Sequence, residues 1–110
     1  MPTPAGSGTQ TATIGTEHTL LTTTTPGDYA LKVDKNAMQA GDSLELRIYD
    51  TVLSGGVSRV AYKYSSSGAQ PTDDMIAISV PIPIDIGVTF TLKQTAGTGR
   101  AFPWKVLSLP

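Results

Sequence analysis

The chain has 110 residues, with eight basic and nine acidic side chains and no cysteine. This length fits one domain with a buried core, and the balanced charge argues against a basic surface for nucleic acid or an anionic membrane. The lack of cysteine excludes disulfides, thiolate nucleophiles and cysteine metal sites, and no apolar run approaches the ~20 residues of a membrane-spanning helix.

Residues 1–9 are rich in Pro, Gly, Ser and Thr and show no hydrophobic periodicity. They predict a flexible N-terminal arm that becomes ordered on a partner, and residues 10–110 predict the folded domain. The start of the chain lacks the basic and apolar regions of a secretory signal, so we expect a protein made and kept in a cytoplasm. Residues 22–28 end in Pro-Gly-Asp, which predicts a strand end followed by a tight turn.

From residue 29 onward, apolar side chains recur at every second position, which is the period of a strand and not of a helix. The residues expected to face inward are Tyr29, Leu31 and Val33; Leu44, Leu46 and Ile48; Val60, Tyr62 and Tyr64; Ile76, Ile78 and Val80; Val88, Phe90 and Leu92; and Phe102, Trp104 and Val106. Breaks rich in Gly or Pro separate these segments, and only residues 35–40 offer a helical turn. About eight short strands at such spacing predict an all-β, single-domain antiparallel β-sandwich of the jelly-roll type, with a barrel as the main alternative.

The segment 81–86 keeps its isoleucines in step while prolines occupy alternate positions at Pro81 and Pro83. Proline cannot donate a hydrogen bond to a neighbouring strand, so we expect an edge strand or an extended connector here. Edge protection is the simpler interpretation. A protruding apolar connector can also dock on a neighbour, so Pro81 and Pro83 are candidate contact residues.

Three motifs invite a chemical interpretation, and each has a simpler structural one. His18 is the only histidine, so it cannot build a histidine metal cluster, and we expect a surface or capping role. Asp73 and Asp74 follow a serine-rich loop, but the alternating aspartate spacing of a calcium loop is absent and a solvated turn is expected. Residues 97–100, Gly-Thr-Gly-Arg, lead into a predicted strand and not into the helix of a phosphate-binding loop, which favours a hairpin turn. We therefore expect no enzyme activity, metal or cofactor.

Most aromatic side chains share the phase of the apolar residues, which assigns them to the core and argues against a sugar-stacking platform. Tyr49 is the exception, because it lies in phase with Glu45 and Arg47 on the outward face. Tyrosine and arginine are enriched at interfaces. Tyr49, Arg47 and Lys32 are therefore the candidate contact patch.

Three segments resemble small structural proteins encoded by tailed phages. They are residues 29–34, Tyr-Ala-Leu-Lys-Val-Asp; residues 40–48, Ala-Gly-Asp-Ser-Leu-Glu-Leu-Arg-Ile; and residues 91–106, Thr-Leu-Lys-Gln-Thr-Ala-Gly-Thr-Gly-Arg-Ala-Phe-Pro-Trp-Lys-Val. The resemblance covers about residues 10–108. It implies a capsid decoration, or cement, protein: a compact β domain on the capsid surface that binds the major capsid protein and ties neighbouring subunits together.

The same resemblance implies a virion location after synthesis in the host cytoplasm and no catalytic residue, while the balanced charge and the lack of a long apolar run predict no nucleic-acid or membrane partner. A homotrimer or another homo-oligomer at a junction of capsid subunits fits such a role. The arm at residues 1–9 also fits it, because an extended arm can cross to a neighbour and add a strand or a clamp on binding. The alternative is a receptor- or carbohydrate-binding β module of a phage head fibre or tail. A small hydrolase is the weakest hypothesis, because one histidine and no cysteine leave few ways to build a nucleophile or a metal site.

Overall fold

The computed structural model describes residues 3–71 and 75–109, and the regular elements in these ranges are all strands. The nine strands are β1 (Thr3–Thr11), β2 (Glu17–Thr23), β3 (Gly27–Asp34), β4 (Ser43–Asp50), β5 (Arg59–Ser67), β6 (Ile76–Ile78), β7 (Ile82–Ile84), β8 (Val88–Ala96) and β9 (Ala101–Leu109). The expectation of an all-β protein is confirmed. Within the described ranges there is no helix of the length and hydrophobicity needed to cross a membrane.

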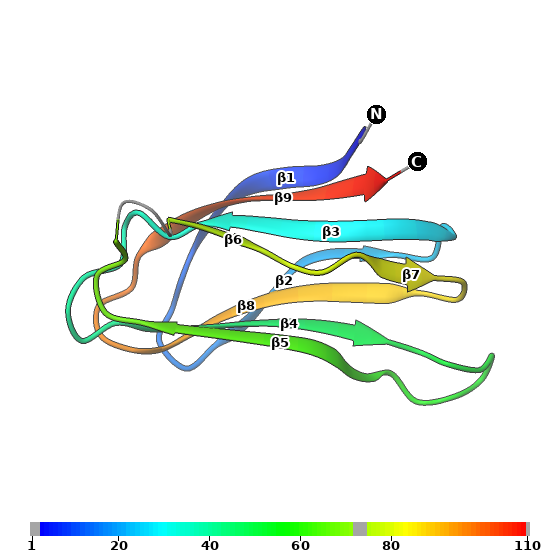
Figure 1. Ribbon diagram of the computed structural model, residues 1–110. Coiled ribbons are helices and arrows are strands. Elements are labelled where there is room, and N and C mark those ends of the chain that lie inside the picture. Colours follow the sequence, from blue (N-terminus) through cyan, green and yellow to red (C-terminus); the bar gives the residue numbers. More distant parts are fainter. Residues whose placement is uncertain (1–2, 72–74, 110) are drawn as a thin grey trace.

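The strands form two antiparallel sheets that lie one above the other, as in a β-sandwich (Figure 1). Sheet A has the order β1-β9-β3-β6, and β7 also pairs with β3. Sheet B has the order β2-β8-β4-β5. The connections 35–42 and 97–100 lie at one end of the sandwich, and the loop between β4 and β5 extends from the other end (Figure 1).

The core lies between the two sheets and follows the predicted alternation in β3, β4 and β8. The buried side chains that it contains from these strands are Tyr29, Leu31, Val33, Leu44, Leu46, Ile48, Val88, Phe90 and Leu92. Phe102 and Val106 of β9 complete it, and Trp104 packs against its margin. Apolar burial of this kind is the main force holding a small fold without disulfides together.

The phase predicted for β6 is wrong, because Ile76, Ile78 and Val80 are exposed. The inward positions belong to Ala77 and Ser79. The Ser79 hydroxyl oxygen accepts a hydrogen bond from the Leu31 amide at 2.9 Å, and the Ser79 amide donates one to the Leu31 carbonyl at 2.9 Å, which fixes this register.

After residue 79 the phase shifts by one position, so that Ile82 and Ile84 of β7 point inward and are buried. Pro83 and the preceding Pro81 are exposed. Among residues 3–71 and 75–109, strand β7 pairs only with β3 and lies at the edge of sheet A, which agrees with the predicted edge strand.

Val60 was also expected to face inward and is exposed instead. In the β4–β5 pairing, Ile48 lies opposite Tyr62 but Tyr49 lies opposite Val60. Residue 61 is therefore an extra residue in β5, and this bulge turns Val60 away from the core.

The flexible arm expected at residues 1–9 is not confirmed, because residues 3–11 form β1, which pairs with β9 from Thr3 opposite Ser108 to Thr11 opposite Ala101. The positions that face Trp104 are glycines. A Cβ atom built on Gly6 would lie 3.1 Å from Leu21 Cδ1, and one on Gly8 would lie 3.5 Å from Trp104 Nε1. The indole fills the space that apolar side chains of β1 would otherwise occupy, so this strand shows no hydrophobic period.

Candidate interaction surfaces

The outer face of sheet B carries polar side chains that are engaged with one another. The Glu17 carboxylate accepts hydrogen bonds from the Tyr49 hydroxyl at 2.7 Å and the Thr91 hydroxyl at 2.6 Å. The Arg47 guanidinium donates to the Glu45 carboxylate at 2.8 Å. The predicted outward neighbours Tyr49 and Arg47 therefore lie on one face, but their polar ends already have partners in the same chain.

The charges around Glu17 and Arg47 influence the pKa values of both groups. Burial opposes ionisation of Glu17, yet the hydrogen bonds from Thr91 and Tyr49, together with the charges of Arg47 and Lys93, lower its pKa. The pKa of Arg47 is raised, first by a hydrogen bond with Tyr49 and then, against some desolvation, by nearby negative charge. The Glu17 carboxylate is therefore satisfied within the chain, whereas Lys63 lies directly opposite Arg47 in the β4–β5 register and adds positive charge to this face.

Lys32 does not join Tyr49 and Arg47, because it lies on the outer face of sheet A. Its neighbours in the register are Lys105 of β9 and Ile78 of β6. Like charges placed directly opposite in a sheet repel each other. Among residues 3–71 and 75–109, neither lysine forms an ion pair that would relieve this repulsion.

The two lysines border a shallow groove of about 230 Å³ on sheet A. We call it the lysine groove, and its lining residues are Lys32, Val33, Asp34, Ile76, Pro103, Trp104 and Lys105. The exposed side chains of Ile78 and Val80 continue its apolar border along the sheet edge. The groove thus combines apolar contact area with two lysines that have no acidic partner in the described part of the chain.

Pro83 lies on the same sheet as Lys32 but at the opposite end of β3, where it pairs with Asp28. A second shallow groove of about 260 Å³ is lined there by Gly27, Asp28, Pro83, Ile84 and Asp85. The five predicted contact residues are therefore divided: Tyr49 and Arg47 are on sheet B, Lys32 and Pro83 are on sheet A, and Pro81 is at the edge of sheet A between β6 and β7.

Sequence reasoning missed the most exposed apolar side chains of the described chain, which lie in the loop between β4 and β5. Val52 is 80% exposed, Leu53 73% and Val57 67%. We call residues 51–58 the apolar loop. Figure 1 shows that it extends beyond the ends of the neighbouring strands. The signal that would have found it is three aliphatic residues around Gly55-Gly56, outside any strand alternation.

Side chains with potential for chemistry are engaged in structural contacts. His18 Nε2 accepts a hydrogen bond from the Thr13 amide at 3.1 Å, which agrees with a capping role. Asp73 and Asp74, the candidate calcium pair, lie outside the described residues. Within the described ranges no three acidic or histidine side chains gather in a way that suits a metal ion.

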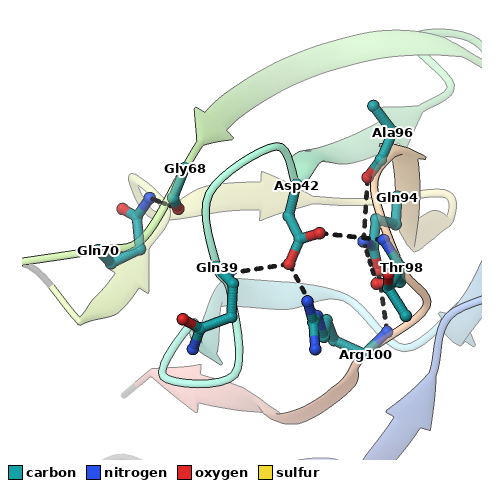
Figure 2. A network of polar contacts seen from close by, with 8 residues as sticks. All are labelled: Gln39, Asp42, Gly68, Gln70, Gln94, Ala96, Thr98 and Arg100. Atoms are coloured by element: carbon teal, nitrogen blue, oxygen red, sulfur yellow. Dashed lines mark hydrogen bonds and ion pairs between the residues drawn. The ribbon is translucent and has the colours of Figure 1, made fainter.

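Lys35 is a buried lysine that links the two sheets. It follows β3, and its ammonium group donates hydrogen bonds to the Tyr64 hydroxyl at 2.8 Å and to the Gln70 side-chain oxygen at 2.9 Å. The same ammonium group lies 5.0 Å from the centre of the Tyr64 ring, within the range of a cation–π contact. Gln70 is held in turn by a hydrogen bond from its amide to the Gly68 carbonyl at 3.0 Å (Figure 2).

The hairpin turn predicted at residues 97–100 is wrong, because the segment joins β8 of sheet B to β9 of sheet A, two strands that do not pair in the described structure. Its polar groups converge on Asp42 (Figure 2). The Asp42 side chain is 1% exposed. Its carboxylate accepts hydrogen bonds from the Gln39 amide at 2.8 Å, the Thr98 amide at 3.1 Å and the Arg100 Nε at 2.8 Å. Arg100 is therefore bound to an internal carboxylate, so its charge is already paired and does not support a phosphate-binding loop at residues 97–100.

Gln94 extends this network beneath the same turn. Its side-chain amide donates to the Ala96 carbonyl at 3.1 Å and the Thr98 carbonyl at 2.7 Å, and its side-chain oxygen accepts from the Arg100 amide at 3.0 Å. The Gln94 backbone carbonyl also accepts a hydrogen bond from the Gly15 amide at 2.9 Å. Together with the contacts of Asp42, these hydrogen bonds connect the loops at residues 12–16, 35–42 and 97–100.

Replacing Gly97 with alanine is expected to destabilise the fold by roughly 2–4 kcal/mol, because two separate costs combine. Gly97 has φ of 91°, and a Cβ atom there would overlap the Asp42 carboxylate. Gly41 has φ of 90° with open space around it, so Gly41→Ala isolates the backbone cost of about 1 kcal/mol. Urea denaturation of both variants measures the difference, and equal losses would contradict the predicted overlap.

Acid is expected to destabilise the protein through Asp42. The hydrogen bond from the Gln39 amide, aided by Arg100 and the Thr98 amide and opposed by burial, lowers the pKa of Asp42 below its ordinary 3.8. A carboxyl with a lowered folded-state pKa contributes stability that is complete above the ordinary value and is lost as the pH falls through it towards the folded-state pKa.

Denaturation midpoints measured between about pH 7 and pH 2 should therefore be level near neutrality and fall in acid. The Asp42→Asn variant cannot lose a charge at this position and should show a shallower fall. An unchanged acid profile in that variant would assign the effect to other carboxyls, such as Glu17.

No family model, curated protein or solved structure matches this chain. The function of the chain is therefore inferred from its own surfaces.

Proposed function

We propose that the chain is a non-enzymatic structural protein of a tailed-phage virion that decorates the capsid and stabilises the head. The observation that carries this proposal is a β-sandwich with large apolar side chains left exposed in two places. They are Val52, Leu53 and Val57 in the apolar loop, and Ile76, Ile78 and Val80 along the edge of sheet A. Exposed apolar groups that gather in patches mark surfaces that bind other proteins.

The strand order supports a jelly-roll arrangement. Strands β6 and β7 can be counted as one interrupted strand, which gives eight strands in the described chain. On that count, sheet A has the order first, eighth, third, sixth, and sheet B has the order second, seventh, fourth, fifth. Two sheets of four strands built from interlocked Greek keys are typical of viral capsid and lectin domains. This agrees with the resemblance to phage structural proteins, although a fold by itself does not determine a function.

A decoration protein acts by binding the assembled shell more tightly than its separate subunits. Each copy then adds its binding free energy to the assembled state alone. Burying apolar side chains at such a contact contributes about 25 cal/mol for each Å² removed from water. Many copies on one shell turn a modest contact into a substantial stabilisation.

Co-sedimentation tests the proposal. The purified chain is mixed with shells assembled from the major capsid protein of the same genome. We expect saturable binding to shells, no binding to unassembled subunits, and a higher melting temperature of the decorated shells. Ile78→Ser should weaken binding if the edge of sheet A contacts the shell, and Thr9→Ser, a change at an exposed position of β1, is the matched control. If the chain does not sediment with the shells even at the highest concentration tested, the proposal is contradicted.

The receptor- or carbohydrate-binding alternative is favoured by one feature of sheet B. A groove of about 240 Å³ is lined by Ser43, Leu44, Glu45, Ser65, Ser66, Ser67 and Thr95, and hydroxyl groups with a carboxylate can bind sugars. Its lining contains no aromatic ring, which sugar-binding sites commonly use for stacking. Specific binding on a glycan array, lost in Glu45→Ala, would favour this alternative.

A further inference from the structure

Lys32 and Lys105 form a pair of like charges on the two central strands of sheet A, β3 and β9 (Figure 1). They lie directly opposite each other in the register, where the Cβ atoms of facing residues are about 4.5–5.5 Å apart. The next positions in the same row are Ser7 of β1, opposite Lys105, and Ile78 of β6, opposite Lys32. The row therefore presents two exposed cations flanked by uncharged side chains.

The adjacent positions on this face are mostly apolar. Ala30 lies opposite Leu107 on one side of the lysine pair, and Ile76 lies opposite Asp34 on the other. Asp34 is the acidic residue among the described residues that line the lysine groove, and its carboxylate already accepts a hydrogen bond from the Asn36 amide at 2.9 Å. The groove therefore keeps an excess of positive charge within an apolar surround.

This combination decides which kind of partner can cover the groove. A purely apolar surface would remove water from both ammonium groups and give them no acceptor, which is unfavourable for a charged group. A nucleic acid would supply phosphates, but such binding relies on many cations, and the chain has a formal net charge of -1 with exposed Ile76 and Ile78 beside the lysines. Carboxylates with neighbouring apolar side chains suit both features of the groove.

A second copy of the chain is a poorer source of these carboxylates. Most acidic side chains of the described chain already accept hydrogen bonds from groups of the same chain; these are Glu17, Asp34, Asp42, Glu45 and Asp50. The acidic groups for the groove are therefore expected from a different protein.

We propose that the lysine groove binds an acidic segment of a different protein, whose carboxylates accept hydrogen bonds from Lys32 and Lys105 and whose apolar side chains pack against Ile76 and Ile78. The inference rests on the proposed function, because it places that segment on the outer surface of the major capsid protein. Partner carboxylates also relieve the repulsion between the two lysines, so binding removes an unfavourable interaction that the free chain carries.

Co-sedimentation with assembled shells tests this contact through a substitution with two opposite effects. Lys105→Glu places a carboxylate opposite Lys32, so the denaturation midpoint should stay level or rise while the affinity for shells falls at least about tenfold. Lys105→Arg keeps the charge and should retain most of the affinity. Lys63→Glu is the matched control and should bind like the wild type, because Lys63 is exposed on sheet B and also lies opposite a cation, Arg47.

The carboxylates of the shell are tested separately. Treatment of shells with a carbodiimide and ethanolamine converts exposed carboxylates to neutral amides, and shells that remain intact after this treatment should no longer bind the wild-type chain. Added salt should weaken binding of the wild type to untreated shells more than it weakens binding of Lys105→Glu.

Two results overturn the inference and leave the decoration role intact, because the chain would then bind through another surface: Lys105→Glu binding with wild-type affinity, or the wild type binding amidated shells as before. If the wild-type chain does not bind shells, both the inference and the proposed function fail. Self-association or duplex DNA binding by the wild type that is lost in Lys105→Glu would assign the groove to a second copy or to phosphates, and either result also overturns the inference.

Discussion

Replacing Asp42 with alanine should lower the free energy of unfolding by about 3–5 kcal/mol, the range measured when one member of a buried ion pair is removed. The carboxylate is the shared acceptor for the Gln39 amide, the Thr98 amide and the Arg100 guanidinium. Without it, two backbone N–H groups and a partly buried cation lose their partner at once. Because these groups belong to the 35–42 and 97–100 loops, we expect that whole end of the sandwich to loosen.

Chemical denaturation gives the loss of stability, and amide hydrogen exchange locates it. Asp85→Ala is the control, because Asp85 is exposed in the turn before β8 and should change stability by no more than about 0.5 kcal/mol. Exchange should accelerate first at the amides of Thr98 and Gln39 in the Asp42 variant. A loss below about 1 kcal/mol, with those amides still protected, would show that the network contributes little.

The strands that could be predicted from sequence are those whose two faces meet different surroundings. In β3, β4 and β8 one face meets the core and the other meets water, so apolar and polar residues alternate and Leu31, Leu46 and Phe90 were placed correctly. Strand β6 fails this rule, because its inward positions are Ala77 and Ser79 and its outward positions are isoleucines. Apolar and polar residues do alternate in β6, but there the larger apolar residues face outward, which is the opposite of what the alternation predicts.

Strand β1 was missed because its inner positions carry Gly6, Gly8 and Gln10, none of which is apolar and large. Hydrophobic periodicity detects side chains that fill space, whereas Gly6 and Gly8 leave space for Trp104, a side chain from another strand. The sequence shows that a residue is small, but it does not show which side chain from another strand packs against it. The same limit hid the buried Asp42 and Lys35, because each is satisfied by partners that lie far away in the chain.

The candidate contact residues show a different limit. The outward direction of Tyr49 and Arg47 followed from their phase, but the grouping of Lys32 with them required knowing which strands share a sheet. Strand β3 belongs to sheet A and β4 to sheet B. Consecutive strands joined by residues 35–42 thus place their outer faces on opposite sides of the molecule, and alternation within a strand carries no information about that choice.

Removal of residues 1–9 should destabilise the protein by at least about 3 kcal/mol, comparable to the loss of a large buried side chain. Most of β1 disappears, so one edge of β9 loses its antiparallel partner from Thr3 to Thr9. The indole of Trp104 and the side chain of Leu21 also lose the backbone of Gly6 and Gly8 that covers them. Trp104 is the only tryptophan in the chain, so its fluorescence reports on this site directly.

The truncated chain should show a lower denaturation midpoint and tryptophan emission shifted to longer wavelength. The double variant Thr3→Ser/Thr9→Ser is the control, because it keeps the strand and alters only exposed side chains. An unchanged midpoint and emission would instead mean that residues 3–9 are a dispensable arm that is free to cross to a neighbour. If β1 is part of the folded sheet, a loss of shell binding after truncation would follow from destabilisation of the domain and would not locate the contact proposed with the capsid.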